Sequence, residues 1–360
     1  MSAVFLLLLA AVAIWLQWLS KRHCLDGLDV EAGIDRRTAE CTESFTLTTV
    51  VTNARILPVF FLHLSECIPC EMDVELDGTG VVRQENILSS APRSTLEQAT
   101  FVMPRQRLTR VLTASISKRG RYVLRDIMLQ AGDFLGLEEQ SAQFRTYREI
   151  VILPPRADMA KFEPAFGHYL GDISAQRFIF PDPILTAGFR EYTGREPQRD
   201  ISWPRSLRDG RLMVKQYDHT SELTATVILN ISGGSHEEME DCFSTARCVC
   251  ERLEKKHISY SFLTNASIVS GDGGWSYISD GLGARHLATI LTGLGSASYA
   301  YISPLDRLLE RAGSKREQGR GFILITPALG SREMSHVRKL ERQTGQRVLI
   351  LAVREKEAVV

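Results

Sequence analysis

Residues Gly188–Asp218 read GFREYTGREPQRDISWPRSLRDGRLMVKQYD and lead directly into Leu223–Ile231, the most apolar run of the second half of the chain. The segment contains six arginines, with acidic side chains interleaved among them. Such interleaving favours ion pairs within a folded segment over a solvated basic tail. We call residues 188–218 the central box, and we expect it to be a folded, self-neutralised insertion in front of a buried strand.

Length and charge limit the function classes. A chain of 360 residues is long enough for two or three domains. The 43 lysines and arginines balance the 43 aspartates and glutamates, so the net charge is zero. Nucleic-acid-binding proteins usually carry a basic excess, and we therefore expect no nucleic-acid partner.

The cysteines do not indicate a disulfide framework, because their number, seven, is odd. Cys67 and Cys70 form one CxxC pair, but the following residues indicate a strand or loop. A redox pair needs a helix N-terminus that lowers the thiol pKa, and zinc needs further ligands. We interpret the two cysteines as part of a strand-connecting turn and leave their role open.

The N-terminus is strongly apolar. Ala3–Leu19 contains one polar residue, Gln17, and Lys21 and Arg22 follow it. A helix of this length spans roughly 25 Å, enough for the short end of bilayer thickness. Because no basic n-region or small-residue cleavage site is present, a cleaved signal peptide is disfavoured. We predict a transmembrane anchor over residues 1–22, single-pass in the cell membrane, with the bulk of the chain in the cytoplasm.

The rest of the chain predicts two different architectures. Residues 24–148 contain short strands separated by polar turns, which is typical of an antiparallel, Ig-like β-sandwich. Residues 149–222 form a connector with the central box. Residues 223–360 alternate strands and helices and predict a doubly wound α/β domain. The expected fold class is therefore α+β multidomain with an N-terminal transmembrane helix.

The end of the strand at 223–230 resembles a metal site. Asn230-Ile-Ser232-Gly-Gly-Ser235 is similar to the Asp-x-Ser-x-Ser motif of von Willebrand factor A domains. Asn230 replaces the aspartate, and Ser235 comes one residue late. Hard cations prefer anionic oxygens, so we expect no bound metal at Asn230, Ser232 and Ser235. These residues are expected to cap the turn and the helix behind it.

Three motifs of the central box are specific: Phe189-Arg190-Glu191-Tyr192-x-Gly194, Arg199-x-Ile201-x-Trp203 and Ser206-x-x-x-Gly210-x-Leu212-x-Val214. Upstream turn motifs are Arg119-Gly120-x-Tyr122 and Asp133-Phe-x-Gly136-Leu. On these residues the whole chain resembles bacterial membrane proteins of the "domain of unknown function 58" family, which carry a von Willebrand factor A-like domain. Arg195 and Pro204 depart from that family's usual acidic and basic residues.

The resemblance implies a partner rather than a reaction. Proteins of that family look like partners of MoxR-type AAA+ ATPases and other membrane proteins, in complex assembly or envelope maturation, with no assigned catalytic activity or cofactor. We therefore expect a non-enzymatic, membrane-anchored scaffold or adaptor. The candidate partner-binding residues are Arg190, Glu191, Tyr192, Gly194, Arg199, Trp203 and Gly210.

Two alternative functions remain. The first is a hydrolase that uses Glu191 and Asp200, which would need one carboxyl with a raised pKa. Neighbouring arginines instead lower carboxyl pKa values and favour ion pairing. The second is a divalent-cation-dependent adhesion module at Asn230. We expect Tyr192 and Trp203 to be core or brace residues rather than platforms for a ligand.

Overall fold

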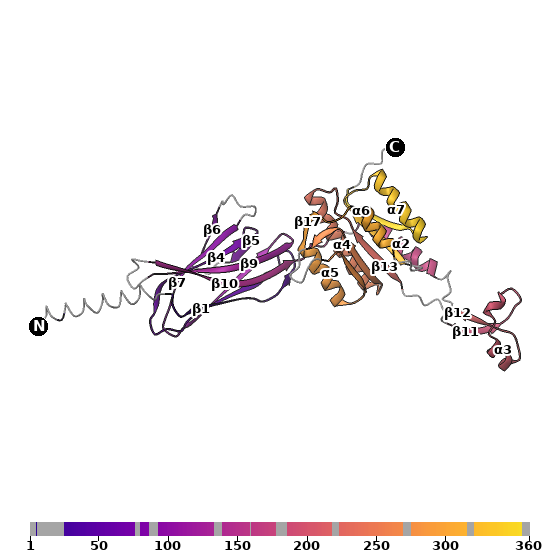
Figure 1. The fold of residues 1–360 in the computed structure, drawn as a ribbon, viewed down its shortest axis with the longest axis horizontal. Helices are drawn as coiled ribbons and strands as arrows, with labels where there is room; N and C mark the ends of the chain where they lie inside the picture. The colour runs from indigo at the N-terminus through magenta and orange to yellow at the C-terminus, as the bar shows by residue number, and fades with distance from the viewer. Residues whose placement is uncertain are drawn as a thin grey trace. The chain divides into compact units, whose positions relative to one another are not determined.

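The structure is a computed structural model that describes residues 5, 25–75, 80–85, 93–132, 139–158, 160–177, 186–217, 223–268, 275–314 and 320–354. The chain divides into two compact units, Met1–Pro155 and Arg156–Val360 (Figure 1). Apart from Phe5, the predicted anchor at residues 1–22 lies outside the described residues, as does the turn at Asp133–Gly136.

Among the described helices, none combines the length and apolar composition needed to cross a membrane. The longest of them, α4 (His236–Lys255), has 20 residues, but charged side chains occur throughout it, including Glu237, Asp241 and Arg252. The predicted transmembrane helix, and the single-pass cell-membrane location with a cytoplasmic bulk that depends on it, therefore have no support among the described helices.

The first unit consists of strands. In chain order they are β1 (Leu28–Ile34), β2 (Thr38–Ala39), β3 (Phe45–Asn53), β4 (Val59–Pro69), β5 (Met72–Glu75), β6 (Gly80–Glu85), β7 (Arg93–Val102), β8 (Arg107–Ile116), β9 (Gly120–Gly132) and β10 (Glu139–Ile152). One sheet has the order β1-β3-β8-β5, and the other has the order β2-β10-β9-β4-β7-β6. Among the described strands of this unit, all pairings are antiparallel except that between β2 and β10.

Apolar side chains from both sheets meet in two buried clusters. Phe45 of β3 and Ile68 of β4 belong to one cluster, whereas Val51 of β3 and Leu62 of β4 belong to the other. Because side chains alternate between the faces of a strand, every second residue of β3 reaches this interior. The two sheets therefore pack face to face around a divided core.

The second unit contains α2 (Glu163–Arg177), β11 (Thr186–Glu191), η1 (Gln198–Asp200), α3 (Trp203–Asp209), β12 (Met213–Tyr217), β13 (Thr224–Leu229), α4, β14 (Ser259–Thr264), β15 (Ala266–Ile268), β16 (Tyr277–Gly281), α5 (Ala284–Ser296), β17 (Ala297–Tyr301), α6 (Leu305–Gly313), β18 (Arg320–Thr326), α7 (Ser331–Thr344) and β19 (Val348–Ala352). Its largest sheet has the order β16-β14-β13-β18-β19. The inner pairings are parallel, and the edge strand β16 is antiparallel to β14.

The predicted fold class is wrong. It specified a transmembrane helix, an Ig-like sandwich and a doubly wound von Willebrand factor A-like domain. The structure is mostly β-rich with several small sheets, and its five-stranded sheet is mixed rather than wholly parallel. Residue spacing indicates single strands and helices, but strand order depends on contacts between residues far apart in the sequence.

The connector before the central box contributes helix α2 to the core of the second unit. The hydroxyl of Tyr169 lies 2.8 Å from the carbonyl oxygen of Phe322 and 2.9 Å from that of Arg347. It also accepts the N–H of Phe322 at 2.7 Å. Burial raises the pKa of this phenol, so it stays protonated. One side chain thus joins α2 to the start of β18 and to the residue before β19.

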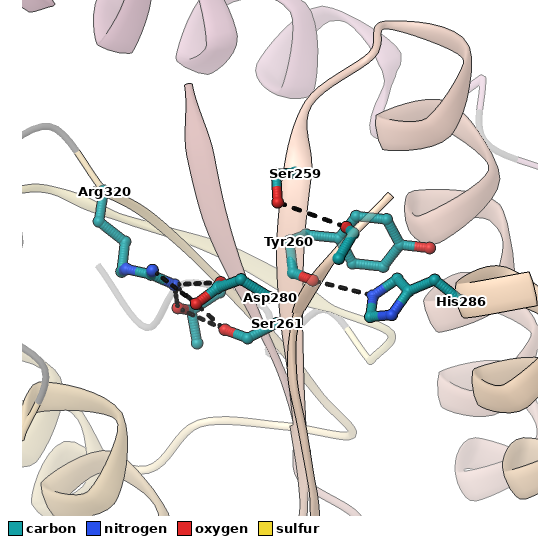
Figure 2. A network of polar contacts seen from close by, with 8 residues as sticks. Ser259, Tyr260, Ser261, Asp280, His286 and Arg320 are labelled. Carbon is teal, nitrogen blue, oxygen red and sulfur yellow. Dashed lines mark hydrogen bonds and ion pairs between the residues drawn. The ribbon is translucent and has the colours of Figure 1, made fainter. Parts of the chain in front are cut away.

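A buried arginine crosses the five-stranded sheet (Figure 2). Arg320 starts β18, and its Nη1 donates to the hydroxyls of Thr226 on β13 and Ser261 on β14, at 3.0 and 3.2 Å. Its guanidinium then binds Asp280 on β16 through two bonds of 2.8 and 3.0 Å. Arg320 is 1% exposed. Its side chain therefore links four adjacent strands of the sheet.

A second group of contacts attaches the antiparallel edge strand β16 and the helix α5 to the rest of the sheet (Figure 2). His286 of α5 contacts the carbonyl oxygen of Tyr260 through Nε2 at 2.9 Å, and the ring of Tyr260 meets the imidazole edge-on. The hydroxyl of Ser259 donates to the carbonyl oxygen of Gly281 at 3.4 Å. Helix α5 and strand β16 are thereby attached to β14.

Replacing Arg320 with methionine should lower the free energy of unfolding of the second unit by about 3 kcal/mol, because a half-buried Asp280 loses its counter-ion. Urea unfolding followed by the fluorescence of Trp275, whose ring packs against Phe262, measures this loss. Arg354→Met removes an arginine that is 68% exposed and pairs with Glu238, and it should cost less than about 1 kcal/mol. Equal losses in both variants would contradict the role given to Arg320.

Candidate protein-binding site in the central box

The central box forms a small module of its own. Strands β11 and β12 pair antiparallel, with Glu191 opposite Met213, and η1 and α3 lie between them in the sequence. Ser206 fixes α3 to this ribbon, because its hydroxyl donates to the carbonyl oxygen of Ser202 and accepts the N–H of Met213, both at 2.8 Å. Gly210 ends the helix with φ +66°, a left-handed conformation that favours glycine.

The interleaved charges of the box pair with one another, as expected. Arg190 binds Glu196 at 2.7 Å, and Arg205 binds Asp209 at 2.8 Å one helical turn away. Further pairs are Arg211 with Glu191 and, at 3.9 Å, Arg199 with Asp200. Exposed pairs of this kind stabilise a fold only weakly, each by at most about 1 kcal/mol. They do, however, hold each carboxylate beside an arginine.

Glu196 is the acid most strongly held in its ionised form. The hydroxyl of Thr193 donates to its carboxylate at 2.8 Å, and the N–H of Thr193 donates at 3.0 Å. These hydrogen bonds, together with Arg190, lower the pKa of Glu196 to about 2. Such a carboxyl stays charged at neutral pH and is unsuited to donate a proton.

The apolar side chains of α3 are turned outward. Trp203 is 61% exposed and Leu207 is 85% exposed. Their spacing of four residues places them on the same side of the helix. Phe189 of β11 is also exposed, with the guanidinium of Arg205 5.8 Å from its ring centre. A core position for Trp203 is therefore wrong, whereas Tyr192 is half-buried.

The sequence-predicted box residues lie in one module. Arg190, Glu191 and Tyr192 are consecutive at the end of β11 and just beyond it, and Gly194 follows in a turn with φ +85°. The other three are Arg199 in η1, Trp203 at the start of α3 and Gly210 at its end. Leu207 was not among the predicted residues, although its distance of four from Trp203 in a short helix was a usable signal.

Two of the degenerate metal-site positions, Asn230 and Ser232, lie in a hydrogen-bonded cluster at the carboxyl ends of β13 and β18. The side-chain oxygen of Asn230 accepts the hydroxyl of Ser232 and the amide of Asn265, both at 2.7 Å. The Nδ2 of Asn230 donates to the hydroxyl of Thr326 at 2.9 Å. Asn230 is fully buried. Ser235 instead caps α4, where its Oγ accepts the N–H of Glu238 at 3.3 Å.

This strand-end cluster has the chemistry of a structural hydrogen-bond network that connects the ends of neighbouring strands, rather than that of a cation site. Its amides and hydroxyls already bind one another, and none of them carries a negative charge. A divalent cation would need anionic oxygens to replace its hydration shell. Within the described ranges, no group of three or more His, Cys, Asp or Glu side chains could hold a metal ion. The residues at this cluster therefore do not fit a cation.

A groove on the outer face of the six-stranded sheet was not predicted from the sequence. It has a volume of about 750 Å³ and is lined by alternate residues of β4, His63, Ser65 and Cys67, with Glu97 of β7 and Met128 of β9 among its walls. Cys67 is an exposed free thiol inside β4, so the expected strand-connecting turn begins only after it. The sequence did contain a signal for this groove. Along β4 the residues His63, Ser65 and Cys67 alternate with buried ones, which indicates a solvent-facing side of the strand.

Comparisons with known proteins assign no family. No protein-family model matches the chain, and no curated protein matches it. Among solved structures, one titled "AvmM Catalyzes Macrocyclization in Alchivemycin A Biosynthesis" has a TM-score of 0.24 and 10% identity, and covers 37% of this chain and 93% of its own. The GAE domain of GGA2p from Saccharomyces cerevisiae has a TM-score of 0.22 and 16% identity, covering 33% and 89%. A cohesin module from Clostridium perfringens has a TM-score of 0.25 and 8% identity, covering 34% and 96%. These likenesses are too weak to support a function.

Replacing Asn230 with alanine should lower the free energy of unfolding by about 2–3 kcal/mol, since the buried amide of Asn265 and the hydroxyl of Ser232 lose their acceptor. Ser235→Ala, in the same loop, removes only a helix cap and should cost about 1 kcal/mol. Urea unfolding of the two variants measures the difference. A loss at Asn230 no larger than that at Ser235 would show that the cluster is not a structural joint.

Proposed function

We propose that this protein is a non-enzymatic adaptor or scaffold that binds a partner protein through the outward face of helix α3. The observation that supports this most strongly is the pair Trp203 and Leu207, exposed side by side on a helix that Ser206 and Gly210 hold in place. We call Trp203 and Leu207, with the neighbouring Phe189, the α3 docking face.

The composition of the α3 docking face suits a protein–protein contact. Burial of apolar surface is the main favourable term in association, and tryptophan and arginine are enriched among residues that dominate binding energy. The face offers a tryptophan and a leucine, with Arg205 beside Phe189. Ion-paired side chains such as Arg190 with Glu196 provide a polar rim. A partner would gain most by covering Trp203.

We propose an AAA+ ATPase of the MoxR type as the partner, acting with this chain in the assembly of protein complexes or in envelope maturation. This assignment rests on the motifs of the central box that resemble the "domain of unknown function 58" family. The same motif that carries the resemblance contains Trp203, and the structure leaves that side chain available to a partner.

The two alternative functions have less support. For a hydrolase, Glu191 and Asp200 would have to act as acid and base, but they lie beside Arg211 and Arg199. For cation-dependent adhesion, the strand-end cluster would need carboxylate ligands, and its central residue is Asn230.

Trp203→Ala and Leu207→Ala should each weaken binding to the purified AAA+ ATPase by at least about tenfold, because each removes apolar area buried on association. Isothermal titration calorimetry with the full chain measures the dissociation constant. Circular dichroism should stay unchanged, since both side chains already lie in solvent.

Ile302→Ala is the matched control, because Ile302 lies outside the box and is 66% exposed, close to the value for Trp203. It should leave the dissociation constant unchanged. Wild-type affinity in both box variants would contradict the docking site. Failure of the wild-type chain to bind the ATPase would instead contradict the choice of partner.

A further inference from the structure

The interior of the first unit contains a layer of polar side chains between its two apolar clusters. On β3, Thr49 lies between Leu47 of one cluster and Val51 of the other. On β10, Thr146 and Arg148 occupy the equivalent place. The same level contains Glu66 of β4 and Arg110 of β8. We call Thr49, Glu66, Arg110, Thr146 and Arg148 the polar layer.

Glu66 is the only carboxylate of the polar layer, and both of its oxygens accept hydrogen bonds. It is 1% exposed and accepts the hydroxyl of Thr49 at 2.8 Å. Arg148 donates to its second oxygen through Nη2 at 3.0 Å, and Arg110 donates to its first oxygen through Nη2. Glu66 therefore joins the two sheets, because Thr49 and Arg110 belong to one sheet and Arg148 belongs to the other.

The charges of the polar layer do not balance. Two guanidinium groups face one carboxylate, and an arginine side chain stays protonated in proteins. Burial and the neighbouring Arg148 lower the pKa of Arg110, while Glu66 opposes that shift. One positive charge is thus left over in this layer, where the side chain of Arg110 is 11% exposed and donates to Gln98 at 3.4 Å, and Arg148 is 3% exposed. An uncompensated ion at such a buried level is strongly unfavourable.

Several donors of the layer also have no acceptor. Within the part of the chain that the structure describes, Nε and Nη1 of Arg148, Nε of Arg110 and the hydroxyl of Thr146 are buried without a hydrogen-bond partner. Arg148 is only 3% exposed. Buried donors are almost always paired in folded proteins, so four of them at one level indicate an acceptor that the described residues do not provide.

We propose that the polar layer binds a small inorganic monoanion, with chloride as the physiological example, beside Nη1 of Arg148 and the hydroxyl of Thr146. A water molecule could accept the same hydrogen bonds, but it would leave the extra positive charge in place. A chloride ion meets both requirements, because it is an acceptor and carries one negative charge. Binding to the folded state alone stabilises the first unit by mass action.

Hydrogen–deuterium exchange of the full chain tests this proposal. Exchange is measured in sodium chloride and in sodium gluconate at equal ionic strength. In chloride, peptides from β4, β8 and β10 should exchange more slowly, by up to about tenfold for each tenfold excess of chloride over its dissociation constant. Peptides from β13 and β18 serve as the internal control and should exchange equally in both salts.

Arg148→Met provides the discriminating variant, because it leaves Glu66 and Arg110 as a neutral pair. The chloride effect should disappear in this variant and should weaken in Thr146→Val, which removes only the hydroxyl. Arg145→Met, on the exposed side of the same strand, should keep the full effect. A chloride effect that survives in Arg148→Met would overturn the proposal.

Bromide replaces chloride in a crystallographic test that does not depend on any variant. Crystals of the full chain grown in sodium bromide should show an anomalous peak within about 3.5 Å of Arg148 Nη1. Equal exchange in chloride and gluconate, together with no bromide peak in the polar layer, would show that the layer is satisfied by water only and would overturn the proposal.

Discussion

The ion pair between Arg320 and Asp280 is the interaction on which the second unit most depends. One side chain crosses from β18 over β13 and β14 to the antiparallel edge strand β16, and three strands provide it with acceptors. Because a buried guanidinium needs these acceptors, the observed strand order places all of them within its reach. The first unit also contains a buried ion-pair network that joins its strands, because Glu66 binds arginines from both of its sheets.

Local signals in the sequence were sufficient for several elements. Ser235 and Glu238 predict the start of a helix, and α4 begins there with a capping box. Non-local features could not be predicted. Asp280 lies 40 residues before Arg320, and nothing in either segment reveals that they pair. The antiparallel direction of β16 has the same origin, and it is one of the features that the predicted fold class missed.

In the candidate site, too, the local features could be predicted from the sequence and the non-local features could not. The ion pairs of the central box follow from charges close in the sequence, such as Arg205 and Asp209, and they could be anticipated. The exposure of Trp203 could not be anticipated, because a tryptophan between a serine and a proline is equally compatible with an interior position. Asn230 was correctly seen to lack a charge, but its bonds to Asn265 and Thr326 depend on strands β14 and β18 being neighbours of β13.

We propose that helix α3 presents a docking face for a partner protein. A photo-crosslinking residue placed at Leu207 of the full chain, with the purified AAA+ ATPase added, tests this most directly. We expect a crosslink to one defined surface of the ATPase. Unlabelled wild-type chain should compete it away, and it should be absent when the same label replaces Ile302. No crosslink from position 207, or equal crosslinking from both positions, would contradict it.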